Sequence, residues 1–467
     1  MSRLIVVSNR VQFSSETGAS ATGGLAMAIG AALREHQGVW FGWSGKTTEK
    51  YTGHLQLDRI DGVTVAKVDL EPQDIEEYYN GYANKTLWPL FHDRIDLTAY
   101  ERPFGEGYGR VNARFAEALA PLIQPDDIIW VHDYHLIPLG RELRRLGVKN
   151  RIGFFLHIPW PARQLLATLP RHAELVASLF DYDLVGTHAQ SFQAALAGYI
   201  INEADGEVMP NGDAFAFGKH TRLGVFPIGI DVGDFEAASS SDTAKESFAR
   251  MRESLAGRQM IIGVDRLDYS KGLEERFLAY ERYLADTPEA REKVFLLQIA
   301  TVSRDGVEAY QDLRNRLDAV SGRVNGQFAT FDWVPLRYVN SPYRRDELAG
   351  IYRAAHVGLV TPLRDGMNLV AKEYVAAQDP EDPGVLILSR FAGAAAQMKD
   401  ALIVNPFSRE DVADAIRRAL AMPREERVRR WTSLIEGVRR DDVIAWRESF
   451  VDALAGVEPK ARIAPAA

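Results

Sequence analysis

The stretch MIIGVDRLDYSKGL, residues 260–273, contains the parts of one supersecondary unit. An apolar run from Met260 to Val264 leads into a polar loop, and apolar residues then recur at spacings of three and four from Leu273 to Leu284. A buried strand, a loop and an amphipathic helix in this order are typical of a parallel α/β sheet. Because ligands of such sheets bind at the carboxyl ends of the strands, we expect functional residues in the loops that follow the strands.

The same alternation recurs along most of the chain and predicts two series of strands. The first series comprises Leu4–Ser8, Ile128–Val131, Ile152–Leu156, Leu184–Gly186 and Val225–Pro227. The second comprises Met260–Val264, Val294–Ile299, Phe328–Phe331, Val357–Val360, Val385–Leu388 and Ala401–Val404. We therefore expect an α/β protein with two Rossmann-like domains, each built on a doubly wound parallel sheet.

The segment that separates the two series predicts the domain boundary. Pro227 to Asp231 precedes the polar stretch Ala237–Thr243, which is the best candidate for a linker, although an ordinary surface loop is the alternative. We expect domains at residues 1–230 and 231–441, and a disordered tail at 459–467, which is rich in alanine and proline.

The composition excludes several classes of protein. The 467 residues are 46% hydrophobic and 25% charged, as in a soluble globular chain, and the formal charge of −9 disfavours nucleic-acid binding. The absence of cysteine excludes disulfides, thiolate nucleophiles and cysteine-ligated metals, and it fits a reducing cytoplasm. The apolar run Leu4–Val7 is too short for a signal peptide, and no run reaches the ~18 apolar residues of a membrane span. We expect a cytoplasmic protein that binds neither nucleic acid nor membranes.

One loop in each series could bind phosphate. Arg10 follows the first strand, and Gly23 and Gly24 open a helical pattern, where glycine lets backbone N–H groups approach an anion. A plain tight turn is the alternative for these glycines. In the second series Arg266 and Lys271 could both face a diphosphate, the arginine through its fork and the lysine as a point charge. Solvated surface cations are the alternative here.

Histidines and an aspartate follow two strands of the first series. Residues 132–135 read HDYH, and His157 follows the next strand. We do not expect a metal site, because His132 and His135 lie three apart at a strand-to-loop junction without an HExxH helix or a set of carboxylates. Hydrogen bonding of Asp133 and His157 to a polyol is the favoured interpretation, and capping of the following turn is the alternative.

The stretch TPLRDGMNLVAKE, residues 361–373, has the most distinctive pattern. Backbone N–H groups between Gly366 and Leu369, next to a helix N-terminus, could bind an anion. Asp365 lies in the loop, and Glu373 in the first helical turns could accept hydrogen bonds from ribose hydroxyls. A carboxylate that only stabilises the first turn of the helix is the alternative for Glu373.

Aromatic and cationic residues elsewhere suggest a second, anionic ligand. Tyr79 and Trp88 lie in a long loop-rich insertion, and Arg304 follows the strand Val294–Ile299. Aromatic faces stack on sugars and arginine suits a phosphate, although most such aromatic residues belong to the core.

Taken together, these segments resemble the trehalose-6-phosphate synthase family, which comprises retaining glycosyltransferases of the GT-B fold (family 20). The matching strings are VSNR (7–10), GGLA (23–26), WFGWSG (40–45), EYYN (77–80), LWP (87–89), WVHDYH (130–135), GFFLHIP (153–159), RLDYSKG (266–272) and TPLRDGMNLVAKEY (361–374). The resemblance covers roughly residues 2–455. It implies an active site in the cleft between two Rossmann-like domains, and a helix at about 442–458 that crosses back to the first domain.

The resemblance also implies a reaction in trehalose biosynthesis, a process linked to osmoprotection. Glucose would pass from a nucleotide sugar, commonly UDP-glucose, to glucose 6-phosphate, giving α,α-trehalose 6-phosphate with retention at the donor carbon. The leaving phosphate itself would accept the proton of the acceptor, so that no protein nucleophile is required. No cofactor or metal is implied, and a homo-oligomer is expected.

Position by position, the resemblance implies two groups of binding residues. The acceptor site would consist of Arg10, Trp40, Tyr79, Trp88, Asp133 and Arg304. The donor site would consist of Gly23, Gly24, His157, Arg266, Lys271, Asp365, Gly366, Met367, Asn368, Leu369 and Glu373. The residues expected to take part in catalysis are Asp133, His157, Arg266, Lys271 and Asp365.

Three alternatives remain open. The chain could use another phosphorylated acceptor, such as glycerol 3-phosphate, or it could be a catalytically inactive sugar-phosphate sensor. A glycoside hydrolase that pairs Asp133 with Asp365 is a third alternative, although it would not need a cationic diphosphate loop. Trp160 replaces the usual phenylalanine of the family, and the loop Val11–Thr22 has its own composition, so the acceptor is the least defined part of the prediction.

Overall fold

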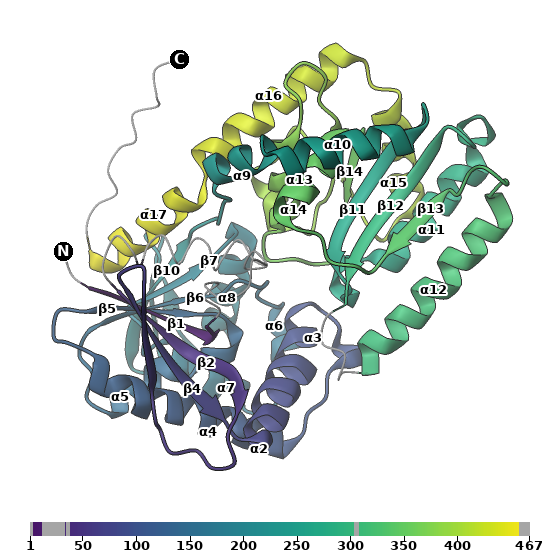
Figure 1. The fold of residues 1–467 in the computed structure, drawn as a ribbon. Coiled ribbons are helices and arrows are strands. Elements are labelled where there is room, and N and C mark those ends of the chain that lie inside the picture. Colours follow the sequence, from purple (N-terminus) through teal and green to yellow (C-terminus); the bar gives the residue numbers. More distant parts are fainter. Residues whose placement is uncertain (1–2, 12–32, 34–37, 303–307, 457–467) are drawn as a thin grey trace. The chain divides into compact units, whose positions relative to one another are not determined.

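A computed structural model describes residues 3–11, 33, 38–302 and 308–456 of the chain (Figure 1). The chain divides into two compact units, which we call unit 1 (Met1–Ile228 with Val443–Ala467) and unit 2 (Gly229–Asp442). Each unit contains its own largely parallel sheet, which confirms the fold class expected from the sequence. No helix of the described residues is long and apolar enough to cross a membrane.

Within the described residues, unit 1 contains a ten-stranded sheet in the order β3-β4-β2-β1-β5-β6-β7-β10-β9-β8. The strands are β1 (Leu4–Arg10), β2 (Val39–Thr47), β3 (Gln56–Ile60), β4 (Val63–Leu70), β5 (Ile128–His132), β6 (Arg151–Phe155), β7 (Leu184–Thr187), β8 (Glu207–Val208), β9 (Asp213–Ala216) and β10 (Lys219–Val225). The strands from β4 to β10 in this order are parallel, and antiparallel pairs occur only at the two ends of the sheet.

The helical segments of unit 1 include a last helix that returns from the end of the chain. They are α2 (Pro72–Asp74), η1 (Ile75–Leu87), α3 (Trp88–Phe91), η2 (Ile95–Leu97), α4 (Arg102–Leu119), η3 (Ala120–Leu122), η4 (Tyr134–Leu136), α5 (Leu139–Arg145), α6 (Arg163–Leu166), α7 (His172–Leu179), α8 (Gln190–Glu203) and α17 (Val443–Ala455).

Helix α17, yellow in Figure 1, packs on β6 and β7. The ring of Phe450 stacks on Trp130 with centroids 4.7 Å apart. A Cβ added at either Gly153 or Gly186 would lie 2.8 Å from the Phe450 ring, so these two glycines create the space that the helix needs. The final helix is therefore part of the core of unit 1.

Within the described residues, unit 2 contains a six-stranded, all-parallel sheet in the order β13-β12-β11-β14-β15-β16. Its strands are β11 (Gln259–Arg266), β12 (Val294–Thr301), β13 (Leu336–Val339), β14 (Val357–Val360), β15 (Val385–Ser389) and β16 (Leu402–Val404). Its helices are α9 (Val232–Ser239), α10 (Asp242–Leu255), η5 (Tyr269–Lys271), α11 (Leu273–Asp286), η6 (Pro288–Ala290), α12 (Glu308–Phe328), α13 (Arg345–Ala354), α14 (Leu369–Ala377), η7 (Gly393–Ala396), α15 (Arg409–Leu420) and α16 (Arg424–Arg440).

Two predicted strands are wrong. Phe328–Phe331 is the end of α12 and a turn, in which the Phe331 side chain is exposed, and the strand of this region is Leu336–Val339. The predicted strand Val225–Pro227 begins where β10 (Lys219–Val225) ends. Phe331 in the first place, and Phe226 and Pro227 in the second, are apolar residues of connections, so hydrophobicity alone predicted strands at the wrong residues.

Candidate active site

The carboxyl end of β1 is held by two side-chain hydrogen bonds. Trp40 Nε1 donates to Ser8 Oγ at 2.8 Å, and Tyr78 OH donates to Asn9 Oδ1 at 2.7 Å. Trp40 is buried in β2, whereas Arg10, the last residue of β1, is exposed. The indole of Trp40 thus positions the strand end from which Arg10 projects.

A chain of aromatic rings links Arg10 to the segment η1. The Arg10 guanidinium lies 5.8 Å from the centroid of a Trp43 ring, and Trp43 lies 5.8 Å from the ring of Tyr79. Tyr79 in turn stacks on His135, with centroids 6.0 Å apart. Trp88 is buried at the start of α3. Segment η1 is π-helical. This conformation is rare in proteins, and where it occurs it often lies at a functional site. The sequence predicts this region only as a loop-rich insertion.

Asp133 lies at the end of β5 with a φ of 77°, which a residue other than glycine seldom adopts. Its Oδ1 accepts hydrogen bonds from the N–H groups of Tyr134 at 3.0 Å and His157 at 3.2 Å. Its own N–H donates to the carbonyl of Phe155 at 2.8 Å. The carboxylate therefore ties together the loops that follow β5 and β6. Backbone strain of this kind is concentrated at active sites and ligand-binding loops.

Three histidines lie at the ends of neighbouring strands β5, β6 and β7. His132 Nδ1 and His157 Nε2 share a hydrogen bond of 3.0 Å, and the rings of His157 and His188 are 5.3 Å apart. Burial lowers the pKa of both His132 and His157 well below the usual value, and the next histidine in the row lowers each further. Both rings are therefore neutral at pH 7, and His157 can offer a neutral imidazole to a sugar hydroxyl.

This histidine row predicts that acid destabilises the protein. Below pH 6.5 the histidines of the unfolded chain bind protons, whereas the buried rings of the folded protein stay neutral. The free energy of unfolding therefore falls as the pH drops, by up to ~1.4 kcal/mol per pH unit for each such histidine. Urea unfolding of the native protein and of His132→Gln between pH 7 and 5 measures this effect. The variant should show the shallower dependence on pH, and equal slopes would contradict the prediction.

In unit 2, the loops after β11 and β14 meet through an ion pair. Lys271 Nζ lies 2.5 Å from Asp365 Oδ2, and their side chains are only 12% and 13% exposed. Asn368 Nδ2 donates to the same carboxylate oxygen at 3.1 Å. Arg266, the last residue of β11, is exposed. The two cations predicted from the sequence thus differ in exposure, because Lys271 is nearly buried in its ion pair with Asp365 and Arg266 is exposed.

The loop 365–368 ends in an unusual helix cap. Asn368 has a φ of 76°, and its Oδ1 accepts a hydrogen bond from Ala371 N at 3.3 Å at the start of α14. Gly366 and Met367, in the middle of this loop, are buried. Glu373 lies in the second turn of α14, where burial raises the pKa of its carboxyl group and Arg345 partly opposes the rise. Leu369 begins this helix, so its backbone N–H belongs to the positive end of the helix dipole.

The predicted site residues of unit 1 come from several elements. Arg10 ends β1, and Asp133 and His157 follow β5 and β6, whereas Trp40 lies within β2, and Tyr79 and Trp88 belong to η1 and α3. The structure gathers Arg266, Lys271, Asp365, Gly366, Met367, Asn368, Leu369 and Glu373 around two loops of unit 2. Gly23, Gly24 and Arg304 lie outside the described residues. In the part of the chain that is described, no group of three or more His, Cys, Asp or Glu side chains could hold a metal ion.

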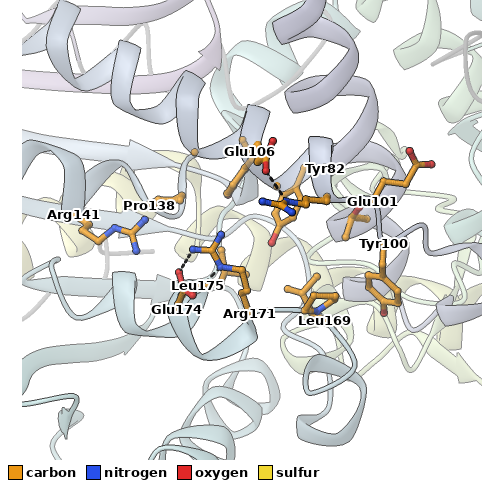
Figure 2. Close-up of a pocket in the computed structure, with 16 residues that line it drawn as sticks. Tyr82, Tyr100, Glu101, Glu106, Pro138, Arg141, Leu169, Arg171, Glu174 and Leu175 are labelled. Atoms are coloured by element: carbon orange, nitrogen blue, oxygen red, sulfur yellow. Dashed lines mark hydrogen bonds and ion pairs between the residues drawn. The ribbon is translucent and has the colours of Figure 1, made fainter.

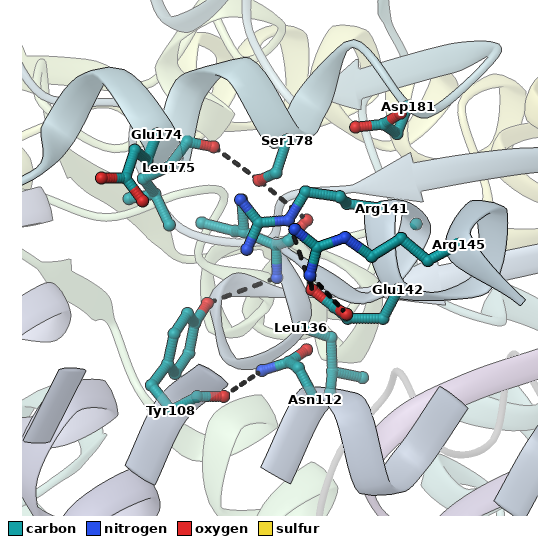
Figure 3. A network of polar contacts seen from close by, with 12 residues as sticks. Tyr108, Asn112, Leu136, Arg141, Glu142, Arg145, Glu174, Leu175, Ser178 and Asp181 are labelled. Atoms are coloured by element: carbon teal, nitrogen blue, oxygen red, sulfur yellow. Dashed lines mark hydrogen bonds and ion pairs between the residues drawn. The ribbon is translucent and has the colours of Figure 1, made fainter. Parts of the chain in front are cut away.

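Unit 1 also contains a cavity of about 570 Å³ that none of the described site residues lines (Figure 2). Arg171 and Glu174 both line this cavity and form an ion pair with each other (Figure 2). Tyr108 also lines this cavity, and Asn112 Nδ2 donates to the carbonyl of Tyr108 at 2.9 Å (Figure 3). The same amide group donates to the carbonyl of His135 at 3.1 Å. The cavity wall is thereby connected to the turn that follows Asp133.

The chain is similar to known proteins over almost its whole length. The model of glycosyltransferase family 20 matches residues 2–456. A trehalose-6-phosphate synthase of Sinorhizobium fredii is 48% identical over 456 residues, which is 97% of this chain and 98% of the relative. A UDP-forming α,α-trehalose-phosphate synthase from Burkholderia xenovorans, solved in complex with glucose-6-phosphate, is 48% identical with a TM-score of 0.93, covering 97% of this chain and 100% of that one. An E. coli structure bound with UDP-2-fluoro glucose is 45% identical with a TM-score of 0.93, covering 98% of this chain and 100% of that one.

Proposed function

Because this chain belongs to glycosyltransferase family 20, we propose that it transfers glucose from UDP-glucose to glucose 6-phosphate and forms α,α-trehalose 6-phosphate. The reaction retains the configuration of the donor carbon and releases UDP. Similarity over almost the whole length to synthases, including one in complex with glucose-6-phosphate, supports these substrates. The similar E. coli structure with UDP-2-fluoro glucose supports the donor.

The observation that carries the proposal is the cluster of Lys271, Asp365 and Asn368 at the carboxyl ends of β11 and β14. Transfer of glucose requires stabilisation of the charge that develops on the departing diphosphate. A cation held in a fixed position in a partly buried site stabilises such charge without reorganising during the reaction. Lys271 is held in this way by Asp365, and Arg266 supplies a second, exposed cation.

The loop after β14 completes the donor site in this proposal. Backbone N–H groups between Gly366 and Leu369 bind the diphosphate at the positive end of α14. Glu373, below them on the same helix, accepts hydrogen bonds from the ribose hydroxyls. Gly23 and Gly24, which the sequence analysis assigns to the donor site, also bind the donor in this proposal. His157 donates a hydrogen bond to a hydroxyl of the transferred glucose.

The acceptor lies against unit 1 in this proposal. Arg10 and Arg304 bind the phosphate of glucose 6-phosphate, and Tyr79 and Trp88 contact its sugar ring together with Trp40. Asp133 accepts hydrogen bonds from sugar hydroxyls in a position that two backbone N–H groups already fix. The acceptor hydroxyl attacks from the face that the diphosphate leaves and gives its proton to the leaving phosphate oxygen, so the carboxylate need not become a nucleophile.

A nucleotide-release assay tests the proposed function. Purified protein is supplied with UDP-, ADP- or GDP-glucose, each combined with glucose 6-phosphate, glycerol 3-phosphate or no acceptor. We expect nucleotide release only with glucose 6-phosphate, fastest with UDP-glucose, and a non-reducing disaccharide phosphate as product. Release only with glycerol 3-phosphate would show that this compound, and not glucose 6-phosphate, is the acceptor. No release with any pair would favour a sugar-phosphate sensor.

Two further properties follow from the proposal and from the sequence. A chain without cysteine fits a reducing compartment, so we place the reaction in the cytoplasm. We also expect the protein to form a homo-oligomer, which light scattering of the purified protein measures directly.

A further inference from the structure

The donor loop 365–367 is fastened along its length to the segment Phe391–Ala394. Asp365 N donates to Phe391 O at 3.1 Å, Gly393 N donates to Asp365 O at 3.2 Å, and Ala394 N donates to Met367 O at 2.9 Å. A Cβ added at Gly393 would lie 1.9 Å from Gly366 O, so the two backbones are as close as they can be. Any displacement of this segment therefore displaces the donor loop.

Three residues after this segment, the side chain of Gln397 bridges two charged residues. Lys372 Nζ donates to Gln397 Oε1 at 2.9 Å, and Gln397 Nε2 donates to Asp441 Oδ2 at 2.9 Å. Lys372 is only 1% exposed. It lies on α14 directly before Glu373. The lysine, the amide and the carboxylate form a relay from the donor helix to the end of unit 2.

Asp441 lies where the chain enters and leaves unit 2. The unit begins at Gly229 and ends at Asp442. A Cβ added at Gly229 would lie 2.2 Å from Asp441 O and 2.5 Å from Asp442 Cα, so the incoming and outgoing backbones are in direct contact. The relay from Lys372 therefore ends on the pair of segments through which unit 2 is joined to the rest of the chain.

We propose that Lys372, Gln397 and Asp441 are positioning residues, which hold the donor loop and helix α14 in a fixed place relative to the two connecting segments of unit 2. This inference rests on the proposed function, since it assigns the relay to the nucleotide-sugar site. None of the three residues needs to touch the substrate. They act through Phe391–Ala394 and through α14, which carry the loop and Glu373.

The burial of Lys372 is the physical reason to assign it a role. Burial lowers the pKa of its ammonium group to about 8, with Asp441 opposing the shift. An ammonium group taken out of water costs free energy that an apolar side chain of similar length would not. An apolar side chain would therefore stabilise the fold better than Lys372 at this position. The ammonium group is needed only if it orients Gln397.

The first test replaces Lys372 with methionine, which fills a similar volume without the charge. We expect Lys372→Met to unfold at the same temperature as the native protein or at a higher one. Amide hydrogen exchange of peptides covering 361–373 and 391–397 should nevertheless become at least tenfold faster, because the loop loses its attachment. Unchanged exchange in these peptides would overturn the inference, whatever the activity of the protein.

Kinetics provide the second readout. Lys372→Met and Gln397→Leu should each raise the KM for UDP-glucose about tenfold, while the KM for glucose 6-phosphate stays within twofold. The KM of the double variant for UDP-glucose should be no higher than that of either single variant. A matched control is Lys399→Met, an exposed lysine two residues from Gln397, which should change neither exchange nor KM. Equal losses for donor and acceptor would indicate a merely structural role. If the native protein transfers no glucose, the proposed function fails, and the exchange experiment still decides whether the relay positions the loop.

Discussion

Lys271→Ala is expected to lower kcat for glucose transfer by ~10² or more, the loss typical of removing one preorganised group that stabilises developing charge. The lysine ammonium is held 2.5 Å from Asp365 Oδ2 in a site where both side chains are nearly buried. Its removal takes away a cation and also leaves the Asp365 carboxylate without that partner, next to the position proposed for the departing diphosphate. The effect should therefore fall on kcat more than on the KM for glucose 6-phosphate.

Steady-state kinetics with both substrates varied measure this effect. Lys245→Ala is a suitable control, because this lysine is exposed on α10 and pairs only with Asp242 three residues before it in the described contacts. Arg266→Ala should also lower kcat, since Arg266 is the second cation of the same site. A Lys271→Ala variant that is folded and keeps kcat within threefold of the native value would remove Lys271 from the catalytic group.

The positions of the site residues relative to strands could be predicted from the sequence, but their partners could not. Met260–Val264 and Val357–Val360 are short apolar runs, and the polar residues after them had to lie at one edge of a parallel sheet. The ion pair of Lys271 with Asp365 joins residues that are 94 positions apart, so no local pattern indicated it. The same holds for Gln397 and Asp441, neither of which belongs to a distinctive motif.

Tertiary packing also decided where the sequence was ambiguous. Phe331 looked like part of a strand, yet it is exposed in a turn, and Trp333 is the aromatic residue of this region that is buried. Trp160, which departs from the usual phenylalanine, is buried and packs on Phe91 with ring centroids 5.4 Å apart. This tryptophan therefore belongs to the core of unit 1. The pattern of apolar residues predicts a helix or a strand. Which of these residues is buried depends on the elements that pack against them.

Gly393→Ala should damage the donor site through a single added carbon atom. The new Cβ would lie 1.9 Å from the carbonyl oxygen of Gly366 and 3.2 Å from Met367 Cα, and backbone atoms cannot rotate away as a flexible side chain does. Either the segment from Phe391 to Ala394 or the donor loop must move, which breaks the hydrogen bonds that join them. Overpacking of this kind typically costs about 1–3 kcal/mol of stability.

We expect Gly393→Ala to bind UDP at least tenfold more weakly than the native protein in calorimetric titration, and to unfold at a lower temperature. Gly437→Ala is the matched control, because a Cβ at this position in α16 meets no atom within 4 Å. Alanine is favoured over glycine inside a helix by ~1 kcal/mol, so the control should be slightly more stable and should bind UDP normally. If Gly393→Ala bound UDP as tightly as the control does, the close contact between Gly393 and Gly366 would have no part in shaping the donor loop.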